Sequence, residues 1–115
     1  MGYHKPDGGY ADTEEINMAS GVLSATQNGT SFVTGHRTAL RLTLAVTAAS
    51  ASPTLDVAIE TSRDGTTWAA VAAFTQATGV TSQAKVFGPL DRYVRAKETL
   101  GGTGTVTRTI TGELV

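Results

Sequence analysis

The sequence predicts an all-β fold, namely an antiparallel β-sandwich or jelly-roll-like domain of seven or eight short strands that follows an extended N-terminal arm. Apolar and polar residues alternate at 39–49 and again at 55–60, and this period of two is typical of strands with one buried face. The Asp64-Gly65 pair follows the second run and indicates a tight hairpin turn, because glycine adopts the positive φ that such turns need. Further turn signals separate the other strand candidates at roughly even spacing, as in sandwiches and barrels.

Residues 1–19 differ from the rest in composition and show no strand or helix period. Gly, Pro and Asp dominate this segment, and it carries one Lys against four acidic residues, whereas the remainder is mildly basic. We expect an extended or disordered arm at 1–19 and one β-sandwich domain at 20–115. If the arm becomes ordered on a partner, its expected contacts are Tyr3, His4 and Tyr10.

In the first half of the domain, residues 20–26 are a short strand candidate that ends before an Asn28-Gly29 turn. Residues 31–34 are expected to pair back across this turn. The alternating run at 39–49 then places four apolar side chains on one face: Leu40, Leu42, Leu44 and Val46. A helix would need apolar residues three and four positions apart, so this run is a strand. A loop of small residues closed by a proline is expected at 48–54.

The central hairpin spans residues 55–74, with its turn at 63–66. Its first strand points three apolar residues inward: Leu55, Val57 and Ile59. Trp68, the single tryptophan, is expected to open the returning strand as part of the core. Four alanines make the returning strand narrow, which permits close approach by a neighbouring sheet or subunit.

Three strand candidates follow the hairpin, at 84–88, 92–99 and 105–113, and breaks at Pro89 and at the glycines of 101–104 separate them. Thr occupies alternate positions of the last strand, and such a ladder suits a solvated or inter-subunit sheet face. The predicted core combines inward positions of all these strands: Leu40, Leu42, Leu44, Leu55, Val57, Ile59, Trp68, Val94 and Ile110.

The composition limits the classes of partner. The formal net charge is -1, so nucleic acid is not an expected partner. No apolar run approaches the ~18 residues that a membrane helix needs, so a membrane is not expected either. No Cys is present, which excludes disulfides and thiolate sites. Charged residues make up 17%, against about 25% in average domains; Thr and Ala replace them and favour packing against protein.

No catalytic, cofactor-binding or metal-binding set of residues is predicted. The two histidines, His4 and His36, have no Ser or acidic residue at motif spacing, although acid–base catalysis needs such groups to converge. Asp56, Glu60 and Asp64 are a conceivable Ca²⁺ set, but they lack the dense oxygen-rich loop of calcium sites, which favours a solvated strand face. We therefore expect a protein that is not an enzyme and uses no cofactor.

A small basic and aromatic cluster lies in the strand candidate at 92–99: Arg92, Tyr93, Arg95 and Lys97. One interpretation is a surface patch that binds phosphate or single-stranded nucleic acid. The other is a solvated strand face whose cations pair with Asp91 and Glu98, and the net charge favours this second interpretation.

Two stretches carry a resemblance to known families. Residues 60–68 read E-x-S-x-D-G-x-x-W, and residues 87–96 contain the sequence RYVR. Together they resemble small β-sandwich virion proteins of tailed bacteriophages, some of which decorate the capsid, and the resemblance covers residues 38–113. It implies a homo-oligomeric capsid decoration or auxiliary protein that binds the major capsid protein or other virion proteins and stabilises the capsid. It also implies synthesis in the host cytoplasm and a final location on the capsid surface of the virion.

The same two motifs are similar to those of discoidin-type, galactose-binding-like domains, which bind sugars or lipids through loops at one end of a sandwich. This resemblance implies a carbohydrate- or surface-binding module of a tail or fibre. A neck or tail-completion protein is a third interpretation, which differs in its place in the virion. The chain is shorter than a discoidin domain and has no Cys pair, so capsid binding is the favoured hypothesis.

Overall fold

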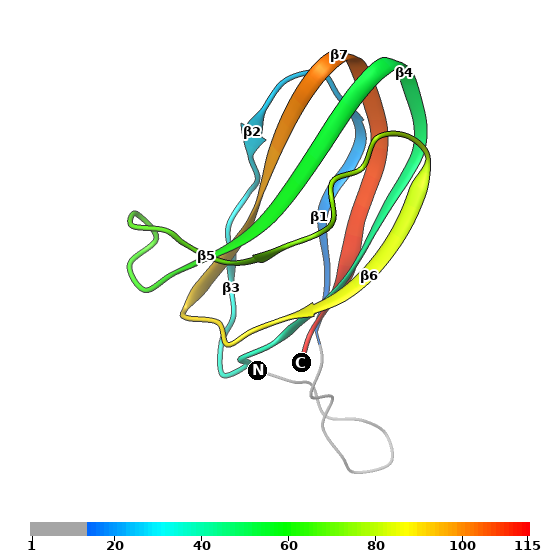
Figure 1. Ribbon diagram of the computed structural model, residues 1–115. Helices are drawn as coiled ribbons and strands as arrows, with labels where there is room; N and C mark the ends of the chain where they lie inside the picture. Colours follow the sequence, from blue (N-terminus) through cyan, green and yellow to red (C-terminus); the bar gives the residue numbers. More distant parts are fainter. Residues whose placement is uncertain (1–13) are drawn as a thin grey trace, which may run out of the picture.

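The computed structural model describes residues 14–115 and confirms the all-β class. These residues contain no helix and form one antiparallel sheet of seven strands, which is not closed. In Figure 1 the long strands β4 and β7 run through the whole body and the shorter strands flank them. The strands are β1 (Glu14–Leu23), β2 (Gln27–Asn28), β3 (Phe32–Val33), β4 (Leu40–Ser62), β5 (Ala69–Ala73), β6 (Thr81–Phe87) and β7 (Tyr93–Leu114).

The sheet folds over itself because β4 and β7 bend together. They stay paired from Leu40 opposite Leu114 to Ser62 opposite Tyr93, and both curve over at the top of Figure 1. One half of this pair is flanked by β1 and β6, and the other half by β2, β3 and β5. We call the first half layer A; it contains β1, 106–114 of β7, 40–46 of β4, and β6. Layer B contains β2, β3, 93–100 of β7, 55–62 of β4, and β5.

The hydrophobic core lies between the two layers, which makes the fold sandwich-like. Both halves of β4 contribute apolar side chains that are almost fully buried: Leu40, Leu42, Leu44 and Val46 from layer A, and Leu55, Val57 and Ile59 from layer B. Each layer therefore removes the apolar face of the other from water, which is the main source of stability. Of the nine predicted core residues, eight are buried and Trp68 is only half-buried.

The strand count is as expected, but two strands are about twice as long as the sequence indicates. The expected loop at 48–54 and the expected glycine break at 101–104 pair with each other instead, for example Pro53 with Gly102. Gly102 and Gly104 have φ values of +69° and +102°, and a side chain on either would collide with a carbonyl oxygen of β4. Because these glycines have no Cβ, the two strands bend without separating.

The sheet begins earlier than expected, at Glu14 and not at residue 20. β1 pairs with β7 along its whole length, and its side chains Ile16 and Met18 are buried. Arg37 also holds the start of β1, with its Nη1 3.3 Å from Glu14 Oε1. A register shift between Asn17 and Ala19 interrupts the alternation of β1, which explains why no strand period is visible there.

The remainder of the expected arm, with Tyr3, His4 and Tyr10, lies outside the described residues.

The expected hairpin of residues 20–26 with 31–34 does not form. Residues 20–23 belong to β1, and the short strands β2 and β3 follow it. Each of them pairs with β7, β2 at Lys97 and Glu98 and β3 at Tyr93 and Val94. Between them, the N–H of Gly29 donates a hydrogen bond of 2.7 Å to the carbonyl oxygen of Ala96. The Asn-Gly segment therefore lies along the edge of β7, which satisfies backbone groups that a local hairpin would leave exposed at that edge.

Candidate functional site

The predicted surface patch lies on the outer face of layer B, but its residues have different surroundings. Arg92 and Lys97 are exposed, while Tyr93 lies against the hairpin turn, beside Gly65. Arg95 is held between two partners: its Nε lies 2.8 Å from Glu60 Oε1, and its guanidinium carbon lies 4.2 Å from the centre of the Trp68 ring. The structure thus pairs Arg95 with Glu60 and leaves Arg92 and Lys97 exposed.

The two acidic partners expected for this patch lie elsewhere. Asp91 is 3.9 Å from Nε of Arg63 in an exposed ion pair, which contributes little to stability. Glu98 is buried between the layers, where its two carboxylate oxygens accept hydrogen bonds of 2.7 and 2.6 Å from Arg108. Glu98 occupies the same face of β7 as Val94 and Ala96, because the three residues alternate along the strand. The sequence pattern therefore predicts an inward position for Glu98, although a charged side chain alone would favour the surface.

The hairpin turn is confirmed, and Asp64 organises it. Asp64 Oδ1 accepts hydrogen bonds from the backbone N–H groups of Thr67 and Thr66, both 2.9 Å long, and from Ser62 Oγ. Ser62 Oγ in turn accepts the N–H of Gly65. The donors from Thr67, Thr66 and Ser62 hold the pKa of the Asp64 carboxyl well below its usual range.

The three carboxylates that could have bound Ca²⁺ do not converge. Asp56 accepts a hydrogen bond of 3.0 Å from Gln76, Glu60 pairs with Arg95, and Asp64 is used by its own turn. Within residues 14–115 no group of three or more His, Cys, Asp or Glu side chains is placed to hold a metal ion.

Replacing Asp64 by Ala should lower the unfolding temperature at neutral pH by a few degrees, because the turn loses its main acceptor. The folded-state pKa is depressed, so the stabilisation is complete above the unfolded-state value of about 3.9 and is lost as the pH falls below it. The difference in unfolding temperature between wild type and Asp64→Ala should therefore shrink from pH 6 to pH 2. Asp56→Ala is the control, and a difference that does not change with pH would contradict this role.

The outer face of layer A has a different chemistry. Because Val106, Arg108 and Ile110 point into the core, the intervening residues of β7 point outward. The strand registers place two rows of uncharged residues across the four strands, in the order β1, β7, β4, β6: Asn17, Thr111, Thr43 and Ala84, and then Ser20, Thr109, Ala45 and Ser82. We call these two rows the threonine face, together with the outward residues at their two ends: Val22 and Thr107 at one end, and Glu15, Glu113, Arg41 and Val86 at the other.

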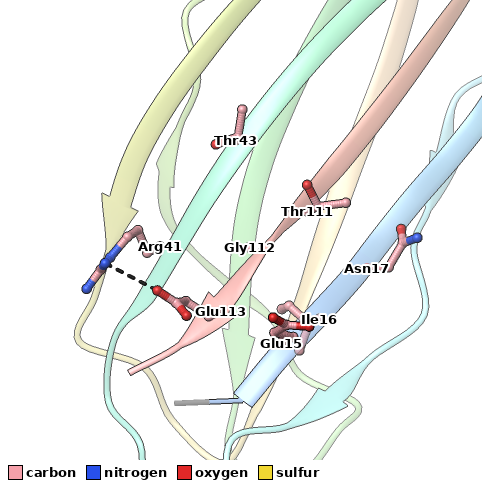
Figure 2. A pocket seen from close by; sticks show the side chains of 8 residues that line it. All are labelled: Glu15, Ile16, Asn17, Arg41, Thr43, Thr111, Gly112 and Glu113. Atoms are coloured by element: carbon pink, nitrogen blue, oxygen red, sulfur yellow. Dashed lines mark ion pairs between the residues drawn. The ribbon is translucent and has the colours of Figure 1, made fainter. Parts of the chain in front are cut away.

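One end of the threonine face is an open groove of about 650 Å³, shown in Figure 2. Arg41 and Glu113 point toward each other there, with Nη1 and Oε1 3.2 Å apart, and Glu15 lies on β1 across the groove. Gly112 of β7 lines the groove between the Arg41–Glu113 pair and Glu15. A side chain at this position would collide with the carbonyl oxygen of Arg41. The groove is lined by the charged side chains of Glu15, Arg41 and Glu113 and, toward the two rows, by Asn17, Thr43 and Thr111.

Two exposed valines lie on the threonine face at its opposite edges. Val22 of β1 pairs with Thr107 and is 65% exposed, and Val86 of β6 pairs with Arg41 and is 62% exposed. Between them lie the Thr, Ser and Ala rows, so the centre of the face is uncharged, and its charged residues, Glu15, Arg41 and Glu113, lie at one end. The centre offers hydroxyl groups and small apolar atoms and no charge that would attract a charged ligand.

No helix in residues 14–115 is long and apolar enough to cross a membrane.

No protein-family model matches the chain, and no curated protein is significantly similar to it in sequence.

Proposed function

We propose that the protein is a non-enzymatic structural protein of a tailed-bacteriophage virion, which binds the capsid through protein–protein contacts and stabilises or decorates it. The observation that supports this most is the threonine face, whose two central rows are uncharged across four strands. A neutral face of small side chains on a rigid sheet loses little side-chain entropy and little hydration when it packs against protein. These properties suit a protein whose role is to adhere to its neighbours.

The two motifs behind the virion resemblance are in contact with each other. Trp68 from the hairpin motif stacks on Arg95 from the RYVR strand, and Arg95 also pairs with Glu60 at the start of the hairpin motif. The motifs therefore have a structural role, because the contact fixes Trp68, just before β5, to Arg95 of β7. The contact explains what the motif residues do in this fold, and the proposed role in the virion rests on the sequence resemblance together with the uncharged rows of the threonine face.

The carbohydrate-binding alternative receives less support. Sugar sites usually present an aromatic ring for stacking, and Trp68 is the aromatic side chain that the hairpin motif supplies. One face of its ring is occupied by the guanidinium group of Arg95 at 4.2 Å, an arrangement that stabilises the protein by about 0.5–1 kcal/mol at a partly exposed site. A saturable signal on a glycan array would nevertheless favour this alternative over capsid binding.

The attachment of the N-terminal segment is tested by deleting residues 1–13. We expect the unfolding temperature to change by less than about 2 °C, because β1 stays intact, and attachment to the capsid to weaken at least 10-fold. The measurement is co-sedimentation with capsids of the encoding phage that were assembled without this protein. Full-length protein that does not bind these capsids would contradict the proposed function, and unchanged binding of the deletion variant would contradict the role of the segment.

A longer deletion, of residues 1–19, serves as the comparison. It also removes Ile16 and Met18, which are buried against the core, and burial of such side chains contributes about 1.5–3 kcal/mol each. We expect this variant to unfold at a markedly lower temperature. If it loses capsid binding while the variant without residues 1–13 still binds, the loss reflects damage to the sheet and not the removal of a contact with the capsid.

A further inference from the structure

We infer that the threonine face binds a second copy of this chain, with the two faces packed against each other across a twofold axis. This inference deepens the proposed function, because it names the partner of the same face. In a twofold contact the same patch is buried on both copies, so the patch must be complementary to itself.

The charge distribution supports self-association of this face and not of the opposite one. The eight residues in the two central rows are uncharged, and charge is confined to one end of the face, where Arg41 pairs with Glu113 and the Glu15 carboxylate lies beside them. The outer face of layer B instead carries charged residues along its centre, where Arg95 pairs with Glu60 and Lys97 is exposed. If two copies of the threonine face pack with their strands antiparallel, their Glu15 carboxylates lie at opposite ends of the contact, so unpaired like charges are not brought together.

The hydroxyl groups make the face self-complementary in a second respect. Thr107, Thr109 and Thr111 are consecutive outward residues of β7, and Thr43 lies beside Thr111 on β4. A hydroxyl group both donates and accepts hydrogen bonds. A row of threonines can therefore form hydrogen bonds with a copy of itself, because each hydroxyl group can act as donor or acceptor. Two rows of amines would offer only donors to each other, and two rows of carboxylates only acceptors.

The size of the face is sufficient for a weak, specific dimer. Four strands spaced about 4.8 Å apart, each contributing about seven residues, give a footprint of roughly 19 by 23 Å. Two such footprints bury on the order of 1,000 Å² of accessible surface, because projecting side chains make the accessible area larger than the flat area. This buried area is at the lower end of the range for specific interfaces. Interfaces of this size are typical of weak or transient association, so we expect a dimer that dissociates at micromolar concentrations.

The two exposed valines favour contact between faces over contact between sheet edges. Val22 and Val86 lie on β1 and β6, the two outer strands of layer A. A face-to-face contact covers both side chains at once. Pairing of β1 with β1 of a second copy, or of β6 with β6, would extend the sheet and leave the valine on the other edge in water.

The decisive variant is Thr109→Glu, which places a charge at the centre of the face. In sedimentation equilibrium from 1 to 300 μM, we expect wild type to show a monomer–dimer equilibrium and Thr109→Glu to dimerise at least 10-fold more weakly. Thr103→Glu is the matched control, because it makes the same change at an exposed position in the bend of β7, and it should dimerise like wild type. Wild type that stays monomeric at 300 μM, or a Thr109→Glu variant that dimerises normally, would overturn the inference.

A cross-linking experiment tests the same contact without a charge. The chain has no Cys, so Thr109→Cys and Thr103→Cys each carry one thiol. A short bis-maleimide should join two Thr109→Cys chains and leave Thr103→Cys monomeric, and equal yields from the two variants would contradict the face-to-face arrangement. Both experiments use purified protein without capsids. A monomer that still attaches to capsids would contradict only this inference, and a dimer that does not attach would contradict only the proposed function.

Discussion

Replacing Glu98 by Leu should lower the free energy of unfolding by about 3–5 kcal/mol, which is one of the two largest effects we expect for a single substitution. Glu98 and Arg108 are 1% and 3% exposed, and they form a bidentate ion pair with hydrogen bonds of 2.7 and 2.6 Å. Glu98 belongs to layer B and Arg108 to layer A, so the pair connects the two layers across the core. Removing the carboxylate leaves the guanidinium buried without its counter-charge.

The double variant Glu98→Leu with Arg108→Leu distinguishes an ion-pair effect from simple loss of packing. It removes both charges and should recover most of the lost stability, because a buried pair can often be exchanged for apolar residues at little cost. The groups that bond to the pair, Gln27 and the Gly21 carbonyl, are not fully buried and can turn to water. Urea unfolding of the wild type, the single variants and the double variant gives the coupling energy. A double variant as unstable as Glu98→Leu would contradict this interpretation.

Replacing Gly104 by Ala should cost about 3 kcal/mol of unfolding free energy. Gly104 has a φ of +102°, and a Cβ there would collide with the carbonyl oxygen of Ser50 on the paired strand. The substitution therefore adds backbone strain to a steric collision inside the β4–β7 ladder, at the bend that allows one sheet to form two layers.

The control for Gly104→Ala is Gly79→Ala. A Cβ at Gly79 would meet no atom within 4 Å, and its φ is not positive. The change there should be neutral or stabilise the protein by up to about 1 kcal/mol, because alanine reduces the entropy of the unfolded chain. Thermal and urea unfolding of both variants measure the difference, and a Gly104→Ala variant within 0.5 kcal/mol of wild type, roughly the scatter of neutral surface changes, would contradict the role of the bend.

The two outer faces differ in chemistry. Layer B presents charged side chains, of which Arg95 and Glu60 pair with each other, and this contact helps to hold the central hairpin in place. Layer A presents hydroxyl and methyl groups across its centre, and its charged residues lie at one end. Under the proposed function, a virion protein of this kind uses layer A to meet its own copy, while the N-terminal segment remains available for the capsid.

The direction in which side chains point along most strands can be read from local patterns in the sequence. The alternation at 39–49, at 55–60 and in the last strand correctly separated Leu42 from Thr43 and Val106 from Thr107, and Asp64-Gly65 correctly located the hairpin turn. These features depend on period and on local backbone geometry, which a few consecutive residues specify. The threonine ladder was likewise visible as an outward row, although only the sheet registers show which residues of β1, β4 and β6 complete its face.

The pairing of segments and the position of the bend depend on contacts between residues far apart in the chain, and these became visible in the folded protein. The segments at 48–54 and 101–104 each have the composition of a loop, and they become strand because they lie opposite each other some fifty residues apart in the chain. The same long-range pairing extends the sheet to Glu14, buries Glu98 against Arg108, and leaves Trp68 stacked on Arg95 outside the core. Each of these outcomes depends on a partner distant in sequence, and local alternation carries no information about that partner.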